Sequence, residues 1–330
     1  MRHDLSAPGA GIMTTIAMPP TKACRIERFG PPGVITLADI DRPVPAAGEV
    51  LVRVHAAGVG PWDAWIRAGK SALPQVLPLT LGSDLSGVVA AIGPGVTGLR
   101  RGDAVFGVTN PNFIGAQADY AVARAAMIAP KPEGIDDIDA ASVPVVAVTA
   151  WQALFEEAGL VRGQTVLIHG AAGNVGFYVM QLARWAGLNV CATASGKDRD
   201  HIRGLGAHTA IDYRTERFED AVRGVDAVID LVGGDTQARS FAVLKPGGIL
   251  VSAVSPPDQA VAAQHGVTAR FFMVDVTTAR LVRVGGMLQR GSLRTEVGAV
   301  LPLADARSAH AMLEGTRPHP RGKIVMRIGD

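Results

Sequence analysis

A glycine-rich turn between an apolar run and an amphipathic segment is the strongest constraint on how this chain folds. Residues 165–187 read TVLIHGAAGNVGFYVMQLARWAG. The β-branched, apolar run at 165–169 has the composition of a buried parallel strand. From Val175 onward apolar residues recur at helical spacing, and Gly187 is placed to end the helix. The stretch therefore predicts a strand, a turn and a helix in that order.

The turn between them, residues 170–176, suits the binding of a dinucleotide. Its glycines let the backbone turn tightly and approach a pyrophosphate, whose charge is stabilised by the free N–H groups at a helix N-terminus. The glycines are three residues apart, rather than in the stricter G-x-G-x-x-G pattern. An ordinary strand-to-helix connection is therefore the alternative interpretation.

The net charge and the length of the chain indicate that the protein binds a small molecule. The 330 residues are enough for about two domains, and the 32 basic and 30 acidic residues leave a net charge of +2. Such a balance favours neither a nucleic-acid groove nor a polybasic membrane contact. We expect a small-molecule substrate, no nucleic acid and no membrane.

The cysteine content and the N-terminal residues indicate the cellular compartment of the protein. Cys24 and Cys191 are the only cysteines, which excludes a disulfide framework and a cysteine-built metal site. Residues 1–20 lack the apolar core of a signal peptide, and no apolar run in the chain reaches 18 residues. We expect a cytoplasmic protein with a flexible N-terminal extension at 1–20.

The rest of the chain shows two different sequence patterns, one after the other. Short candidate strands separated by glycine and proline turns predict an antiparallel β domain; they lie at 25–29, 48–57, 85–92 and 101–108. Alternating strands and helices then predict an α/β domain with a parallel sheet; its strands lie at 165–169, 189–193, 209–212, 226–231, 248–254 and 269–273. The tail, with a helix at 303–313 and a strand at 323–328, is expected to pack onto the first domain.

The end of the second strand of the α/β domain bears on the choice of cofactor. NAD-selective folds carry an acidic residue there, which binds both ribose hydroxyls. This chain has Ala194 and Ser195 instead, followed by Lys197 and Arg199, which favour a 2′-phosphate and hence NADP(H). In the alternative interpretation these two cations begin a solvated helix and Asp198 is the acid, displaced outward. Tyr213, after the third strand, is expected at the adenine end.

A series of segments in order along the chain supports a wider resemblance. They are GVGPWDAWIRAG at 58–69, LGSDLSGVVAAIGPGV at 81–96, RGDAVFG at 101–107, VTAWQALFE at 148–156, VLIHGAAGNVG at 166–176, IDLVGG at 229–234, LKPGGILV at 244–251 and RGKIVMRI at 321–328. On these segments the chain resembles the medium-chain dehydrogenase/reductase superfamily, in its zinc-independent quinone oxidoreductase branch. The resemblance covers residues 23–328.

The resemblance implies a fold and its domain boundaries. A GroES-like β domain with the catalytic residues would comprise 21–144 and 277–330. A Rossmann domain, a doubly wound parallel sheet that binds NADP(H), would comprise 145–276. Zinc-dependent relatives carry metal ligands at the positions of Gly60, Ser83 and Asp84, which suit zinc poorly. We therefore expect no metal.

The resemblance also implies where the cofactor lies. Thr149 would lie beside the nicotinamide, and the turn with Gly170 would hold the pyrophosphate. The pyrophosphate would also contact Gly173, Asn174, Val175 and Gly176. The 2′-phosphate would be surrounded by Ser195, Lys197, Arg199 and Tyr213, with Arg321 or Lys323 of the C-terminal segment at the same phosphate end. The nicotinamide side would contact Gly233, Ser252, Val254 and Phe271.

The substrate pocket and the oligomer follow from the same comparison. The pocket wall would be Gly60, Trp62, Trp65, Lys70 and Ser71, although plain core packing is an alternative for both tryptophans. The family is usually oligomeric, so we expect a homodimer through the edge strand at 269–273, near Phe271.

The expected activity is transfer of a hydride from NADPH to a quinone or another α,β-unsaturated carbonyl. The cofactor carries that chemistry, and the protein orients the reactants and excludes water. An enoyl-thioester reductase is an alternative, but Ser71 replaces the tyrosine usual in such pockets. A non-catalytic NADPH-binding sensor or RNA-binding protein is another, and the near-neutral charge disfavours RNA.

Overall fold

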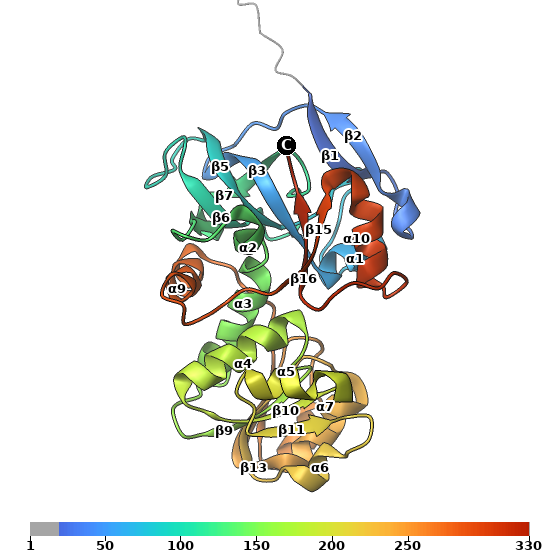
Figure 1. The fold of residues 1–330 in the computed structure, drawn as a ribbon, viewed down its shortest axis with the longest axis vertical. Coiled ribbons are helices and arrows are strands. Elements are labelled where there is room, and N and C mark those ends of the chain that lie inside the picture. Colours follow the sequence, from blue (N-terminus) through green and yellow to red (C-terminus); the bar gives the residue numbers. More distant parts are fainter. Residues whose placement is uncertain (1–19, 330) are drawn as a thin grey trace, which may run out of the picture.

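Two lobes, one above the other in Figure 1, make up the computed structural model, which describes residues 20–329. The expectation for residues 1–20 lies outside the described residues, apart from Pro20. The upper lobe holds both the first and the last elements of the chain, and the lower lobe holds the middle of it.

The lower lobe is built on a six-stranded parallel sheet with the order β11-β10-β9-β12-β13-β14. Its strands are β9 (Thr165–His169), β10 (Asn189–Ala194), β11 (Thr209–Asp212), β12 (Val225–Asp230), β13 (Leu244–Ser252) and β14 (Thr268–Phe271). The helices between them are α4 (Asn174–Ala186), α5 (Arg199–Gly204), α6 (Phe218–Ala221), α7 (Gly234–Ser240) and α8 (Gln259–Gln264). In chain order this is the 3-2-1-4-5-6 sheet of the Rossmann fold, so the predicted α/β, doubly wound class is confirmed.

Antiparallel strands dominate the upper lobe. One sheet has the order β2-β1-β4, and the other has the order β15-β16-β3-β5-β6-β8 with β7 paired to β3. The strands that precede the lower lobe are β1 (Thr21–Ile26), β2 (Thr36–Ile40), β3 (Glu49–Val59), β4 (Leu79–Thr80), β5 (Asp84–Ile92), β6 (Ala104–Val108), β7 (Tyr120–Arg124) and β8 (Ile128–Pro130). The short helices α1 (Pro61–Arg67) and α2 (Asp137–Ala141) lie between and after them.

The first strand begins earlier than the expected 25–29. It pairs with β2 from Thr21↔Ile40 to Arg25↔Thr36, and Cys24 N donates to Gln117 O at 2.8 Å. These partners are distant in the sequence, so long-range pairing decided the boundary and local composition did not.

The tail of the chain returns to the upper lobe, where Figure 1 shows the red C-terminal elements beside the blue N-terminal ones. β16 (Lys323–Arg327) runs antiparallel to β3, with Met326 opposite Ala57, and β15 (Val297–Pro302) pairs with β16. Helix α10 (Ala306–Leu313) packs on α1. Neither β15 nor helix α9 (Thr278–Gln289) was predicted from the sequence; α9 packs against β8 at the junction of the lobes.

A buried helix joins the two lobes. All eight residues of α3 (Pro144–Trp151) are buried, and all but Pro144 and Thr149 belong to one apolar cluster with residues of α4, α9 and β9. A helix that is apolar on every side can be stable only when other elements surround it. The helix continues as a single π-helical turn over Gln152–Glu157. Within residues 20–329, no helix combines the length and apolar character needed to cross a membrane.

The backbone of α4 lies very close to the turn after β9. A Cβ atom at Gly176 would be 2.3 Å from the carbonyl oxygen of Gly170. We expect Gly176→Ala to lower the free energy of unfolding by roughly 1–3 kcal/mol, because that oxygen belongs to the backbone and cannot move alone. The measurement is urea unfolding followed by circular dichroism. Gly204→Ala in α5 is the matched control, since a Cβ added there would have nothing within 4 Å, and equal losses in both variants would contradict the expectation.

Candidate cofactor site

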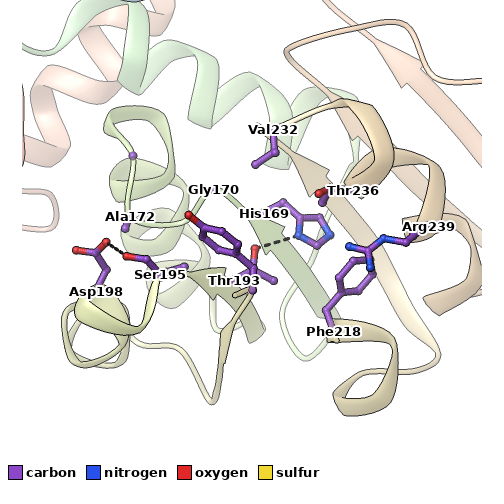
Figure 2. Close-up of a pocket in the computed structure, with 13 residues that line it drawn as sticks. His169, Gly170, Ala172, Thr193, Ser195, Asp198, Phe218, Val232, Thr236 and Arg239 are labelled. Carbon is purple, nitrogen blue, oxygen red and sulfur yellow. Dashed lines mark hydrogen bonds between the residues drawn. The ribbon is translucent and has the colours of Figure 1, made fainter. Parts of the chain in front are cut away.

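A cavity of about 490 Å³ lies at the C-terminal ends of β9 and β10 and extends toward β12 (Figure 2). The strand order reverses between β9 and β12, and open α/β sheets bind ligands at such a point. The glycine turn, the end of β10 and the segments after β11 and β12 supply the lining: His169, Gly170, Ala172, Gly173, Thr193, Ala194, Ser195, Asp198, Tyr213, Phe218, Val232, Thr236 and Arg239.

The glycine turn presents a helix N-terminus at the cavity. Gly170 has a φ of +73°, a conformation that glycine adopts without steric cost, and Gly173 is the residue that precedes α4. No side chain caps this helix, so its first backbone N–H groups, those of Asn174, Val175 and Gly176, lack a side-chain acceptor. The arrangement suits a pyrophosphate, with Gly170 and Gly173 in the cavity wall.

His169 forms part of the inner wall and is held neutral. Burial lowers the pKa of its imidazole to about 4. Its Nε2 lies 3.0 Å from Ser240 Oγ, which donates its own proton to Thr236 O, so Nε2 must carry the imidazole proton. Nδ1 therefore accepts from Thr193 Oγ1 at 3.0 Å. With both nitrogens satisfied, His169 is a packing residue.

Ser195 and Asp198 lie together at one end of the cavity, with Phe218 and Arg239 at the other (Figure 2). Ser195 Oγ donates to Asp198 Oδ2 at 2.5 Å, and Arg321 forms an ion pair with Asp198. Burial raises the pKa of Asp198, but these two partners and nearby Lys197 outweigh it and hold the pKa below its usual range. Tyr213, 58% exposed, also lines the cavity.

Lys197 and Arg199, expected at the 2′-phosphate, do not line the cavity. Lys197 is exposed, and Arg199 pairs with Glu216 and donates from Nε to Ala210 O at 3.1 Å. The short turn after β10 directs Asp198 inward and its two neighbours outward. The alternative interpretation of the sequence, with both cations at a solvated helix start, agrees with the exposed Lys197 and with Arg199 as the first residue of α5, but it placed Asp198 outward rather than in the cavity wall.

Lys323, expected with Arg321 as an alternative at the phosphate end, lies in a different site. It begins strand β16 and is 2% exposed, with Nζ 2.9 Å from Asp84 Oδ2 and 4.3 Å from the centroid of the Trp62 ring. Arg321 still belongs to the preceding loop and reaches Asp198 across the lobe boundary. Because β16 begins between them, Arg321 and Lys323 lie in different sites although they are close in the sequence.

The residues expected on the nicotinamide side lie outside this cavity. Thr149 is buried in α3 and donates from Oγ1 to Val145 O at 2.7 Å. Gly233 N and Ser252 Oγ both donate to the buried Asp230, which holds the ends of β12 and β13 together. Val254 and Phe271 are 42% and 38% exposed.

The five expected pocket residues lie outside this cavity. The Trp62 indole fills the space beside Gly60, where an added Cβ would lie 2.3 Å from the ring. Trp65 is 53% exposed and Lys70 is exposed, while Ser71 Oγ accepts from Leu73 N at 3.1 Å. None of them lines the cavity in Figure 2.

The residues at the positions where zinc-dependent relatives carry metal ligands have other partners. Trp62 Nε1 donates to Ser83 Oγ at 3.0 Å, and Asp84 binds Lys323 and the backbone N–H of Val145. Residues 20–329 contain no group of three or more His, Cys, Asp or Glu side chains that could hold a metal ion. The donor set around Gly60 therefore does not fit zinc.

Comparison with known proteins identifies the family. Residues 46–133 match the family model described as alcohol dehydrogenase GroES-like domain, and residues 205–326 match zinc-binding dehydrogenase. A quinone oxidoreductase of Sus scrofa is 32% identical over 322 residues, which cover 92% of this chain and 97% of that protein. The chain belongs to the medium-chain dehydrogenase/reductase superfamily, in its quinone oxidoreductase-like branch. The upper lobe is therefore GroES-like, as expected.

Two further relatives in this superfamily are informative. A 2-methylene-furan-3-one reductase of Solanum lycopersicum is 35% identical over 265 residues, which cover 76% of this chain and 68% of that protein. A mycobacterial structure complexed with NADPH is 30% identical, with a TM-score of 0.83, and the match covers 93% of this chain and 99% of that one. The superfamily thus includes a structure with the cofactor bound.

Asp63, beside the site that does not fit zinc, makes stability depend on pH. Burial raises the pKa of its carboxyl to about 7, while Oδ2 accepts from Gly60 N at 2.8 Å and Oδ1 has no partner. The pKa of Asp63 in the folded protein lies above the unfolded value of about 3.9. The contribution of this carboxyl to the free energy of unfolding is therefore fully present below the unfolded pKa and is lost as the pH rises through the folded pKa of about 7.

We expect Asp63→Asn to raise the melting temperature more at pH 8 than at pH 5, by about 2 °C or more. The amide oxygen can still accept from Gly60 N, so the helix start is retained. Thermal melts followed by circular dichroism at both pH values test this. Asp200→Asn, at a side chain 97% exposed, is the control, and an equal gain at the two pH values for Asp63→Asn would contradict the expectation.

Proposed function

We propose that this protein is a zinc-independent, NADPH-dependent oxidoreductase that reduces a quinone or another α,β-unsaturated carbonyl. The observation that carries the proposal is the cavity at the point where the strand order of the parallel sheet reverses, with an uncapped helix N-terminus in its wall. The names of the relatives support the substrate class, since one is a quinone oxidoreductase and another reduces a methylene-furanone. The NADPH complex of the mycobacterial relative supports the cofactor.

Each part of the cavity has a task in this proposal. The turn from Gly170 to Gly176 binds the pyrophosphate through backbone N–H groups. Ser195 and Tyr213 in the cavity wall, with Arg321 behind Asp198, bind the adenosine end. NADPH, when bound, supplies a hydride, and the fold holds cofactor and acceptor together away from water.

No metal is assigned to this reaction. The indole at Gly60, and the partners already bound to Ser83 and Asp84, leave no set of zinc donors there. The lobe therefore uses a buried ion pair, Asp84 with Lys323, where zinc-dependent relatives carry metal ligands. This pair organises the start of α3, because Asp84 Oδ1 accepts from Val145 N at 3.2 Å.

Absorbance at the nicotinamide band tests the activity. We expect 1,4-benzoquinone, 9,10-phenanthrenequinone and an alkenal to oxidise NADPH, a simple ketone to react far more slowly, and 1,10-phenanthroline to leave the rate unchanged. Loss of activity with the chelator would contradict the zinc-free proposal. Turnover of an enoyl thioester alone would favour the thioester reductase, and NADPH binding without turnover would favour the sensor.

We further propose a homodimer through β14. Among the described strands β14 ends the sheet, and Phe271 and Met273 at and after its end are 38% and 52% exposed. An exposed edge strand is prone to pair with another chain. Sedimentation velocity should therefore give a dimer for the wild type and a monomer for Phe271→Lys. Val300→Lys, at an exposed apolar residue of β15, is the control and should remain dimeric, and a monomeric wild type would overturn the proposal.

A further inference from the structure

The end of the cavity suited to a 2′-phosphate already holds an anion of the chain itself. The carboxylate of Asp198 lies in the cavity wall and its side chain is only 13% exposed. Its two oxygens are both engaged: Oδ2 accepts from Ser195 Oγ and Oδ1 accepts from Arg321. A hydroxyl and a guanidinium are the donors that a phosphate would need.

Arg321 is the cation that pairs with Asp198 at this end, although it is not itself in the cavity wall. Lys197 is exposed and makes no ion pair with Asp198, and Arg199 is bound to Glu216. Arg239 lines the opposite end, where it lies over the Phe218 ring and pairs with Glu219 and Asp235. A 2′-phosphate that binds beside Ser195 must therefore compete with Asp198 for Arg321.

We infer that Asp198 is an intramolecular counter-ion that the 2′-phosphate of NADPH displaces from Arg321, and that Asp198 thereby limits the preference of this protein for NADPH over NADH. The inference rests on the proposed binding of a nicotinamide cofactor. NADH needs no such exchange, because its 2′-hydroxyl is uncharged and can donate to the carboxylate where it lies. Asp198 is thus a specificity-determining residue.

The same ion pair joins the two lobes. Arg321 precedes β16 of the upper lobe, whereas Asp198 follows β10 of the lower lobe. Gln181 and the backbone of Arg294 bind each other nearby, so the lobes stay in contact when Arg321 changes its partner. When NADPH binds, the 2′-phosphate therefore replaces the Asp198 carboxylate as the partner of Arg321, while the contact between the two lobes is kept.

The test compares two fragments of the cofactor that differ by the phosphate, 2′,5′-ADP and 5′-AMP, by calorimetric titration at physiological salt. We expect Asp198→Asn to bind 2′,5′-ADP about tenfold more tightly, which corresponds to about 1.4 kcal/mol, and to bind 5′-AMP equally or more weakly. Arg321→Gln should weaken 2′,5′-ADP and leave 5′-AMP unchanged. Asp200→Asn removes the same charge two residues away, at a side chain 97% exposed, and should alter neither affinity.

The outcomes separate this inference from the proposed activity. Equal effects of Asp198→Asn on both fragments, or the same effects from Asp200→Asn, would overturn the role of Asp198. Binding of 2′,5′-ADP and 5′-AMP with the expected shifts, but without oxidation of NADPH by any acceptor, would overturn the reductase proposal and support the inference. Failure of the wild type to bind either cofactor would overturn both.

Discussion

The contact between the backbone of α4 and that of the turn after β9 is the constraint on which the cofactor site depends. Gly176 brings the helix against the Gly170 carbonyl, at a distance that leaves no room for a side chain. The helix axis is thereby held over the end of β9, and its N-terminal N–H groups are directed at the cavity. Since β10 and β12 flank β9, their ends are aligned with the same cavity.

The upper lobe depends on a different kind of interaction, a buried group of charges. Asp84 and Lys323 come from strands far apart in the sequence and meet where the tail returns to the first domain. Trp62 covers the ammonium group, and burial raises the pKa of Asp63 close by. Removing one member of such a group leaves an uncompensated buried charge, so these residues constrain one another.

Much of the fold was predictable because the relevant signals are local. The parallel strands were placed to within a few residues, since β-branched runs alternate with helical patterns between 165 and 271. The glycine turn was predicted for the same reason. By contrast, α9 and β15 were missed, and β1 was placed four residues late. Their boundaries follow from partners elsewhere in the chain, such as Ile40 for Thr21.

By itself, the sequence determined the order of strands, turn and helices, the absence of a cysteine framework, and the family, because these depend on residue types and spacings along the chain. Only the tertiary structure decided which side chains meet. It turned Asp198 toward the cavity and Lys197 and Arg199 away from it, brought Arg321 to Asp198, and buried Lys323 beside Asp84. The physical reason is that side-chain direction at a turn or a strand start is set by backbone dihedrals and by distant partners, neither of which a local pattern encodes.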